Sequence, residues 1–137
     1  MTHAARKHRR VSALAVLVLA LAGCGEPDPV NVRGNTVRLN LDEYAIVPRQ
    51  LRVTGPEVHI VASDTGILTH NIKIFSTTKV DAEDKPVQIG DGTNTAHPGE
   101  TVEATVRLAP GRYRLACSIA NHDDLGMHAV LRVRGRS

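Results

Sequence analysis

Short runs in which apolar and polar residues alternate constrain this fold more than any other feature of the chain. The clearest runs cover residues 37–42, 58–63, 102–108, 113–117 and 129–134. A period of two residues is typical of half-buried β-strands. Pairs such as Gly55-Pro56 and Pro110-Gly111 place turns between these runs. The pattern therefore predicts an all-β fold, an antiparallel sandwich or barrel of seven to eight strands.

Weaker signals complete the predicted β-structure. The segments at 51–53 and 70–74 show the same alternation. Residues 78–99 combine charged residues, glycines and prolines with little periodicity, so we predict a long loop there with one short strand near Val87. Tyr113 follows a turn at the start of a run, which suits a core aromatic side chain or a tyrosine-corner hydroxyl bond.

The N-terminal segment has the features of an export signal. A basic stretch precedes eleven mostly apolar residues, 11–21, which are too few to span a bilayer and typical of a signal peptide. The run Leu21-Ala22-Gly23-Cys24 resembles the lipobox of bacterial lipoproteins, in which the cysteine is lipidated. We predict a lipoprotein signal peptide at 1–23, lipidated Cys24 with a tether at 24–35, and one domain at 36–137. The alternative is an ordinary secretory signal with an incidental cysteine.

Removing this signal also removes the apparent basicity of the chain. Four of the 17 Lys and Arg lie in residues 1–23 but none of the 14 Asp and Glu, so residues 24–137 carry 13 basic and 14 acidic residues. This balance gives no argument for an anionic polymer as partner, and few aromatic residues are present to stack on bases. We therefore expect no nucleic-acid partner.

The mature chain is left with one free thiol. If Cys24 carries the lipid, Cys117 is the only other cysteine and can form no internal disulfide. An unpaired thiol in an exported protein calls for an explanation, and metal binding is one.

Cys117 belongs to a group of residues that suits copper. Four residues separate it from His122, and four more separate His122 from Met127, the only methionine after the signal. A copper site of the His₂Cys type needs a thiolate, two imidazoles and a weak axial thioether. One inter-strand loop can supply three of these ligands, and His70, at the start of another apolar strand, is the best candidate for the fourth. The alternative is that Cys117 and Met127 are ordinary core side chains.

The same residues resemble the ligand loop of the cupredoxins, the type 1 blue copper proteins. The resemblance covers roughly residues 36–134. The matching residues are Asp64, Thr65, Gly66, His70, Asn71, Pro110, Gly111, Arg112, Tyr113, Cys117, His122, Gly126, Met127 and Val133. It implies a Greek-key cupredoxin-like sandwich with one copper per chain, bound by His70, Cys117, His122 and Met127. It also implies that Asn71 ties the strand of the first ligand to the cysteine loop, and that His122 is the ligand nearest the surface.

The resemblance also implies an electron carrier rather than an enzyme. We expect a monomer anchored by lipid at the outer face of the cytoplasmic membrane, or on the periplasmic side, with a redox protein as donor and another as acceptor. One alternative is a copper chaperone or buffer with the same ligands. A second is a cupredoxin-like interaction module without a redox role.

Several polar residues near these ligands have two possible roles. Asp123 and Asp124 follow His122, where they either select a partner with a basic face or are simply solvated. His59, His97 and His128 have the outward parity or loop position of solvated surface histidines, with a metal or docking role as the alternative.

Overall fold

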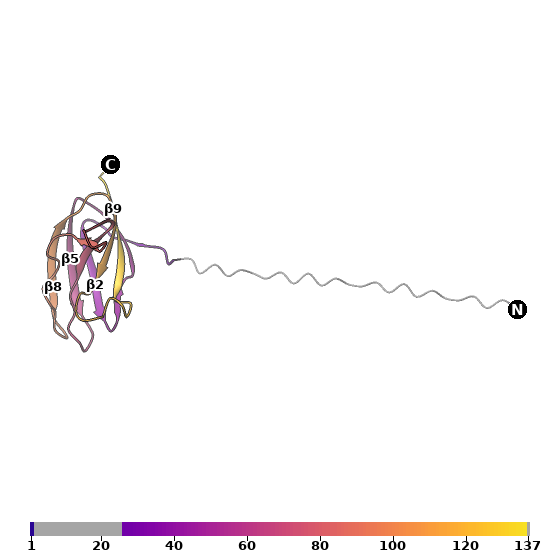
Figure 1. Cartoon of the computed structure of the whole chain (residues 1–137), viewed down its shortest axis with the longest axis horizontal. Coiled ribbons are helices and arrows are strands. Elements are labelled where there is room, and N and C mark those ends of the chain that lie inside the picture. Colours follow the sequence, from indigo (N-terminus) through magenta and orange to yellow (C-terminus); the bar gives the residue numbers. More distant parts are fainter. Residues whose placement is uncertain (2–25, 137) are drawn as a thin grey trace.

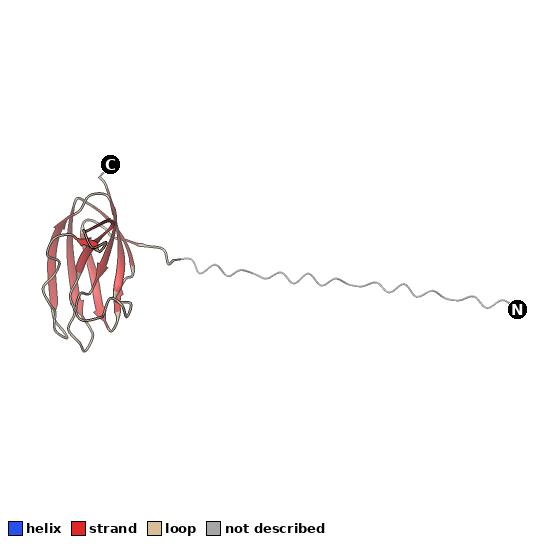
Figure 2. Cartoon of the chain, in the orientation of Figure 1, coloured by secondary structure: helices blue, strands red, loops and turns tan. Residues whose placement is uncertain are grey.

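The structure is a computed structural model that describes Met1 and residues 26–136, in which ten strands and no helix are found. The strands are β1 (Val30–Asn31), β2 (Thr36–Asp42), β3 (Ala45–Val47), β4 (Gln50–Thr54), β5 (Glu57–Asp64), β6 (Lys73–Val80), β7 (Pro86–Gln88), β8 (Thr101–Arg107), β9 (Gly111–Ala116) and β10 (His128–Arg134). Figure 1 shows them running along one elongated domain, and Figure 2 shows that loops alone connect them. The described residues thus include no helix that could cross a bilayer.

The strands form two sheets. The larger has the order β1-β4-β10-β9-β6-β7, and the smaller has the order β3-β2-β5-β8. Strand β9 lies inside the larger sheet, because its last residue, Ala116, pairs with Lys73 of β6 on one side and His128 of β10 on the other. The residue after Ala116 is Cys117, which is therefore held at the end of a strand that is supported on both edges.

The core lies between the two sheets and follows the alternation in the sequence. In β2 the burial alternates so that Val37, Leu39 and Leu41 face inward and are at most 2 % exposed. Leu131 of β10 and Ile60 of β5 are fully buried from the opposite sheets. Burying one such side chain stabilises the fold by about 1.5–3 kcal/mol, so the alternating runs supply most of the driving force.

The predicted all-β sandwich is confirmed, and so is the short strand near Val87, which is β7. The pairing differs from the antiparallel expectation, because β2 pairs with β5 in parallel and β10 pairs with β4 in parallel. Alternation reports which side chains are buried, and it is the same for either strand direction. The structure also has more strands than predicted, since β1 forms within the range predicted as a tether and pairs with β4.

Tyr113 forms the hydroxyl bond expected of it. Its ring is 8 % exposed, and its hydroxyl donates to the carbonyl oxygen of Ala109 at 2.8 Å. This bond closes the turn that leads into β9, the strand that ends at Cys117.

We predict that Tyr113→Phe lowers the free energy of unfolding of the metal-free domain by about 0.5–1.5 kcal/mol, because one internal hydrogen bond is lost. Urea unfolding followed by circular dichroism measures this. Tyr44→Phe is the matched control, since the structure gives its hydroxyl no hydrogen bond to a described residue. Equal losses in the two variants would contradict the role assigned to the Tyr113 hydroxyl.

Candidate metal centre

Three side chains predicted to bind metal converge at one end of the sandwich. His70, Cys117 and His122 each place a ligand atom within 4.8 Å of the others. The exposed fractions of the three residues are 0 %, 1 % and 7 %. His122 is thus the most exposed of them, although it too is buried. A set of one sulfur and two imidazole nitrogens suits soft or borderline metal ions rather than Ca²⁺ or Mg²⁺.

Backbone hydrogen bonds fix the loop that carries Cys117 and His122. The N–H of Cys117 donates to the carbonyl of Met127 at 3.1 Å, and the N–H of Met127 donates to the carbonyl of His122 at 3.0 Å. Within this loop, the N–H of His122 also donates to Ile119 at 3.1 Å. The three residues from the loop are therefore held close together by the chain itself, without a metal.

Met127, the fourth predicted ligand, is fully buried in the same core cluster as Cys117. Its main chain bonds to both of the other loop residues. Its role as an axial ligand stays a prediction, because these contacts place its backbone and not its sulfur.

His70 enters the site from a separate segment, three residues before β6. Its N–H donates to the carbonyl of Ala96 at 3.0 Å, and the N–H of Ala96 donates back to His70 at 2.8 Å. This isolated pair of bonds fixes the backbone of His70 against the loop before β8. The side chain is then directed inward, and its ring centroid lies 5.2 Å from that of His122.

The two nitrogens of the His70 ring have different surroundings. Nε2 lies 3.0 Å from Oε1 of Glu43, whereas Nδ1 is buried and has no hydrogen-bond partner. Because a carboxylate oxygen only accepts, Nε2 is the donor in this contact, which leaves Nδ1 as the nitrogen available to a metal. On the opposite side of the site, Nδ1 of His122 lies 3.6 Å from Sγ of Cys117. His122 therefore turns Nδ1 toward the thiol.

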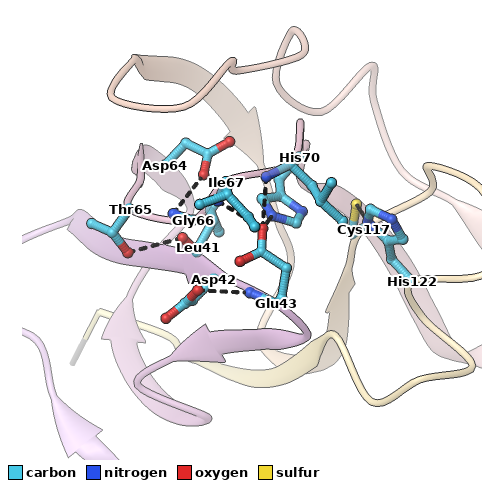
Figure 3. A network of polar contacts seen from close by, with 11 residues as sticks. Leu41, Asp42, Glu43, Asp64, Thr65, Gly66, Ile67, His70, Cys117 and His122 are labelled. Atoms are coloured by element: carbon cyan, nitrogen blue, oxygen red, sulfur yellow. Dashed lines mark hydrogen bonds and ion pairs between the residues drawn. The ribbon is translucent and has the colours of Figure 1, made fainter.

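Glu43 was not predicted to take part in the site. It lies in the turn between β2 and β3, and Figure 3 shows its carboxylate between His70 and the loop of Ile67. The N–H of Leu68 donates to Oε1, and this bond is the main cause that lowers the pKa of Glu43 from 4.5 to about 2. The hydrogen bonds from His70 and Ile67 also lower this pKa, while partial burial raises it. The carboxyl is therefore charged at neutral pH. A lone acid in a turn gives no signal in the sequence that it will meet a histidine 27 residues away.

Asn71 connects the segment of His70 to the cysteine loop. Its Oδ1 accepts from the N–H of Ser118 at 2.9 Å, and its Nδ2 donates to the Ser118 hydroxyl at 3.0 Å. Asn71 is 7 % exposed, so these bonds are partly shielded from water. They hold the residue after His70 against the residue after Cys117.

The two acids that follow His122 have different surroundings. Asp123 accepts from Arg114 and lies 3.1 Å from Nδ1 of His128, while Asp124 is exposed. Asp123 is thus neither a free docking charge nor simply solvated, because a cation on β9 compensates it. His128 joins this surface network and lies outside the candidate site.

The other two histidines also lie away from the convergence of ligands. Nε2 of His59 lies 3.1 Å from Glu103 on the outer face of the smaller sheet, and His97 is exposed in a loop. Cys24 lies outside the described residues.

Comparison with known proteins bears on the fold. No protein-family model and no curated protein matches the sequence. Among solved structures, reduced auracyanin from Roseiflexus castenholzii aligns with a TM-score of 0.61 and 23 % identity, covering 74 % of this chain and 98 % of that one.

Two further structures are similar. Auracyanin A of Chloroflexus aurantiacus, described as a blue copper protein, aligns with a TM-score of 0.59 and 22 % identity, covering 77 % of this chain and 100 % of that one. Auracyanin B gives a TM-score of 0.57 and 20 % identity, covering 80 % and 93 %. The predicted cupredoxin-like fold is confirmed by this likeness.

We predict that Asn71→Ala lowers the free energy of unfolding of the metal-free domain by about 1 kcal/mol, because the Ser118 N–H loses its acceptor. Hydrogen exchange at Ser118 and Cys117 should accelerate in the same variant. Asn121→Ala is the matched control, since the structure gives this exposed loop side chain no bond to a described residue. Unchanged exchange at Ser118 in Asn71→Ala would show that the bond does not hold the loop.

Proposed function

We propose that this protein is a mononuclear copper protein that carries single electrons outside the cytoplasm and converts no substrate of its own. The proposed ligands are His70, Cys117, His122 and Met127. The observation that carries the proposal is the convergence of one buried thiol and two imidazole nitrogens within 4.8 Å.

The residues present fit a copper ion. Nδ1 of His70 is buried without a hydrogen-bond partner, and leaving such a group unsatisfied costs about 1–3 kcal/mol. A metal would supply the missing partner at this nitrogen. The donor set of one thiolate, two imidazoles and one thioether matches the type 1 copper arrangement. The resemblance of the ligand loop to cupredoxins supports the same choice of metal.

Copper, when bound, supplies a one-electron couple between Cu(II) and Cu(I). The protein's part is to hold the ligands so that neither oxidation state requires them to move. The hydrogen bonds of Cys117 and Met127 and the bonds of Asn71 to Ser118 restrain the ligand positions before any metal enters. A restrained site suits fast electron transfer, because little rearrangement accompanies the change of charge.

The same burial favours electron transfer over copper delivery. A chaperone must let a partner's ligands reach the metal and displace its own. Here the three converging residues are at most 7 % exposed, and all three lie in a hydrogen-bonded framework. Electron transfer needs only a short distance between the metal and the partner's redox centre. His122, the most exposed of the three residues, is the proposed path for the electron to the surface.

Exposed apolar side chains near the site could receive a redox partner. Ile67 and Leu68 are 84 % and 40 % exposed, and Leu125 is 50 % exposed. The first two flank the Glu43–Tyr44 turn through the hydrogen bonds of Glu43, and the ring of Tyr44 lies 5.0 Å from that of His122. We propose this surface as the place where a donor and an acceptor dock in turn, with the protein acting as a monomer.

A lipid anchor at Cys24 would confine the domain to the membrane surface. Glu26, two residues after Cys24, is the first residue of the domain that the structure describes. The Glu26 carboxylate lies 3.4 Å from Arg112 and 3.7 Å from Arg132, on the outer face of the larger sheet. The described chain of the domain therefore begins on this face, and confinement by the anchor would raise the concentration of the domain near membrane-bound partners.

We predict that the domain from residue 26 onward, loaded with Cu(II), shows an intense thiolate-to-copper charge-transfer band in the visible region and a narrow copper hyperfine splitting by electron paramagnetic resonance. Cys117→Ser should abolish the band, because the sulfur donor is lost. Met127→Leu is the matched variant, since it keeps the thiolate and should keep the colour while shifting the potential. A colourless wild-type domain that binds Cu(II) weakly would overturn the proposed function.

We predict that the full chain, expressed in a bacterium with lipoprotein processing, fractionates with the membrane and has a mature N-terminus at acylated Cys24. Cys24→Ser should release the folded domain, because no thiol remains to carry the lipid. Mass spectrometry of the mature protein measures both outcomes. Unmodified Cys24 in the mature wild type would contradict the anchor, and it would leave the copper site unaffected.

A further inference from the structure

We propose that Glu43 is a positioning residue for the metal site, which fixes the ring of His70 and places a permanent negative charge behind that ligand. The inference rests on the proposed function, because it concerns the copper ligand His70. The inference starts from the hydrogen bond between Glu43, in the turn after β2 of the smaller sheet, and the fully buried ring of His70. The sequence of the ligand loop does not predict this contact.

One oxygen of Glu43 collects three donors. Oε1 accepts from the N–H of Leu68 at 2.8 Å, from the N–H of Ile67 at 3.0 Å, and from Nε2 of His70 at 3.0 Å. The two backbone bonds fix the carboxylate relative to the segment that leads to His70. The bond to Nε2 then fixes both the tautomer and the rotation of the ring, and Nδ1 is left without a hydrogen bond in a ring that lies beside Cys117 and His122 (Figure 3).

Gly66 leaves the space that this arrangement requires. A Cβ at residue 66 would collide with Oε1 of Glu43 and lie 2.9 Å from its Cδ. Three hydrogen bonds hold the carboxyl group in place, so it could not move away from such a Cβ without breaking at least one of these bonds. The turn at Asp64–Gly66 is therefore shaped around the Glu43 carboxylate, with the N–H of Gly66 donated to Asp64 at 3.0 Å.

The charge of Glu43 has a consequence that a neutral acceptor would lack. A carboxylate bonded to the far nitrogen of an imidazole makes the near nitrogen a stronger donor. The ion with the higher charge gains more from this, so Glu43 should stabilise Cu(II) more than Cu(I) and lower the reduction potential. Residues bonded to metal ligands in this way typically change metal affinity about 10- to 100-fold when mutated.

A second histidine–carboxylate pair in the chain provides a matched control. His59 and Glu103 are 3.1 Å apart, a separation close to that of the site pair. Their side chains are 36 % and 59 % exposed, and neither residue belongs to the metal-ligand group. Glu103→Gln therefore removes the same charge without touching the site.

The experiment compares the wild type with Glu43→Gln, Gly66→Ala and Glu103→Gln, all as soluble domains at pH 7. Competition titrations give the affinities for Cu(II) and Cu(I), and voltammetry gives the potential. Imidazole ¹⁵N spectra of the metal-free proteins give the tautomer of His70. The last measurement needs no copper, so it tests the positioning role separately from the proposed function.

We expect Glu43→Gln to keep the Nε2–H tautomer, because the amide oxygen still accepts, while Cu(II) affinity falls about 10- to 100-fold, Cu(I) affinity falls less and the potential rises. Gly66→Ala should disturb the tautomer and weaken Cu(II) binding although the charge remains. Glu103→Gln should match the wild type.

Two results would overturn the inference. One is a mixture of tautomers at His70 in the metal-free wild type, which would show that Glu43 does not fix the ring. The other is a Cu(II) affinity and potential in Glu43→Gln equal to those of Glu103→Gln, which would show that the charge does not act on the site. A wild type that binds no copper but holds a single Nε2–H tautomer would instead refute the proposed function and keep Glu43 as the residue that positions His70.

Discussion

The burial of His70 is the constraint on which the arrangement of this end of the molecule depends. An imidazole that is 0 % exposed, with Nδ1 unpartnered, is unfavourable in a metal-free core by about 1–3 kcal/mol. The fold keeps the ring in place from three directions: the paired backbone bonds with Ala96, the carboxylate of Glu43, and the neighbouring bonds of Asn71. A histidine that is to bind a metal through this nitrogen needs such support before the metal enters.

These supports also explain why the site lies between the two sheets. The larger sheet places Cys117 just after β9 and Met127 just before β10. The short loop between them therefore forms one side of the site. The smaller sheet contributes the turn after β2, which carries Glu43 across to His70. Any relative shift of the sheets would separate the carboxylate from the ring. The hydrophobic core that fixes the sheets therefore also fixes the geometry of the proposed ligands.

Much of this could be predicted from the sequence because it is local. Alternation identified the inward faces of β2, β5 and β10, and the spacing of Cys117, His122 and Met127 placed three candidates in one loop. The parallel pairing of β2 with β5 could not be predicted, because alternation is the same in either direction. The contact of Glu43 with His70 was missed for a related reason. It depends on how two distant turns meet, and an acid in a turn is ordinarily solvated.

Charge compensation decides which surface is available to a partner. Asp123 follows His122 in sequence, yet its carboxylate is bonded to Arg114, so its charge is neutralised within the domain. The carboxylate of Glu43 keeps its charge, but it accepts hydrogen bonds from Ile67, Leu68 and His70. Asp123 thus contributes little net charge outward, while Ile67 and Leu68, whose N–H groups donate to Glu43, expose their apolar side chains. Contact with the proposed partner there would bury apolar side chains beside a carboxylate whose hydrogen bonds are already made within the domain.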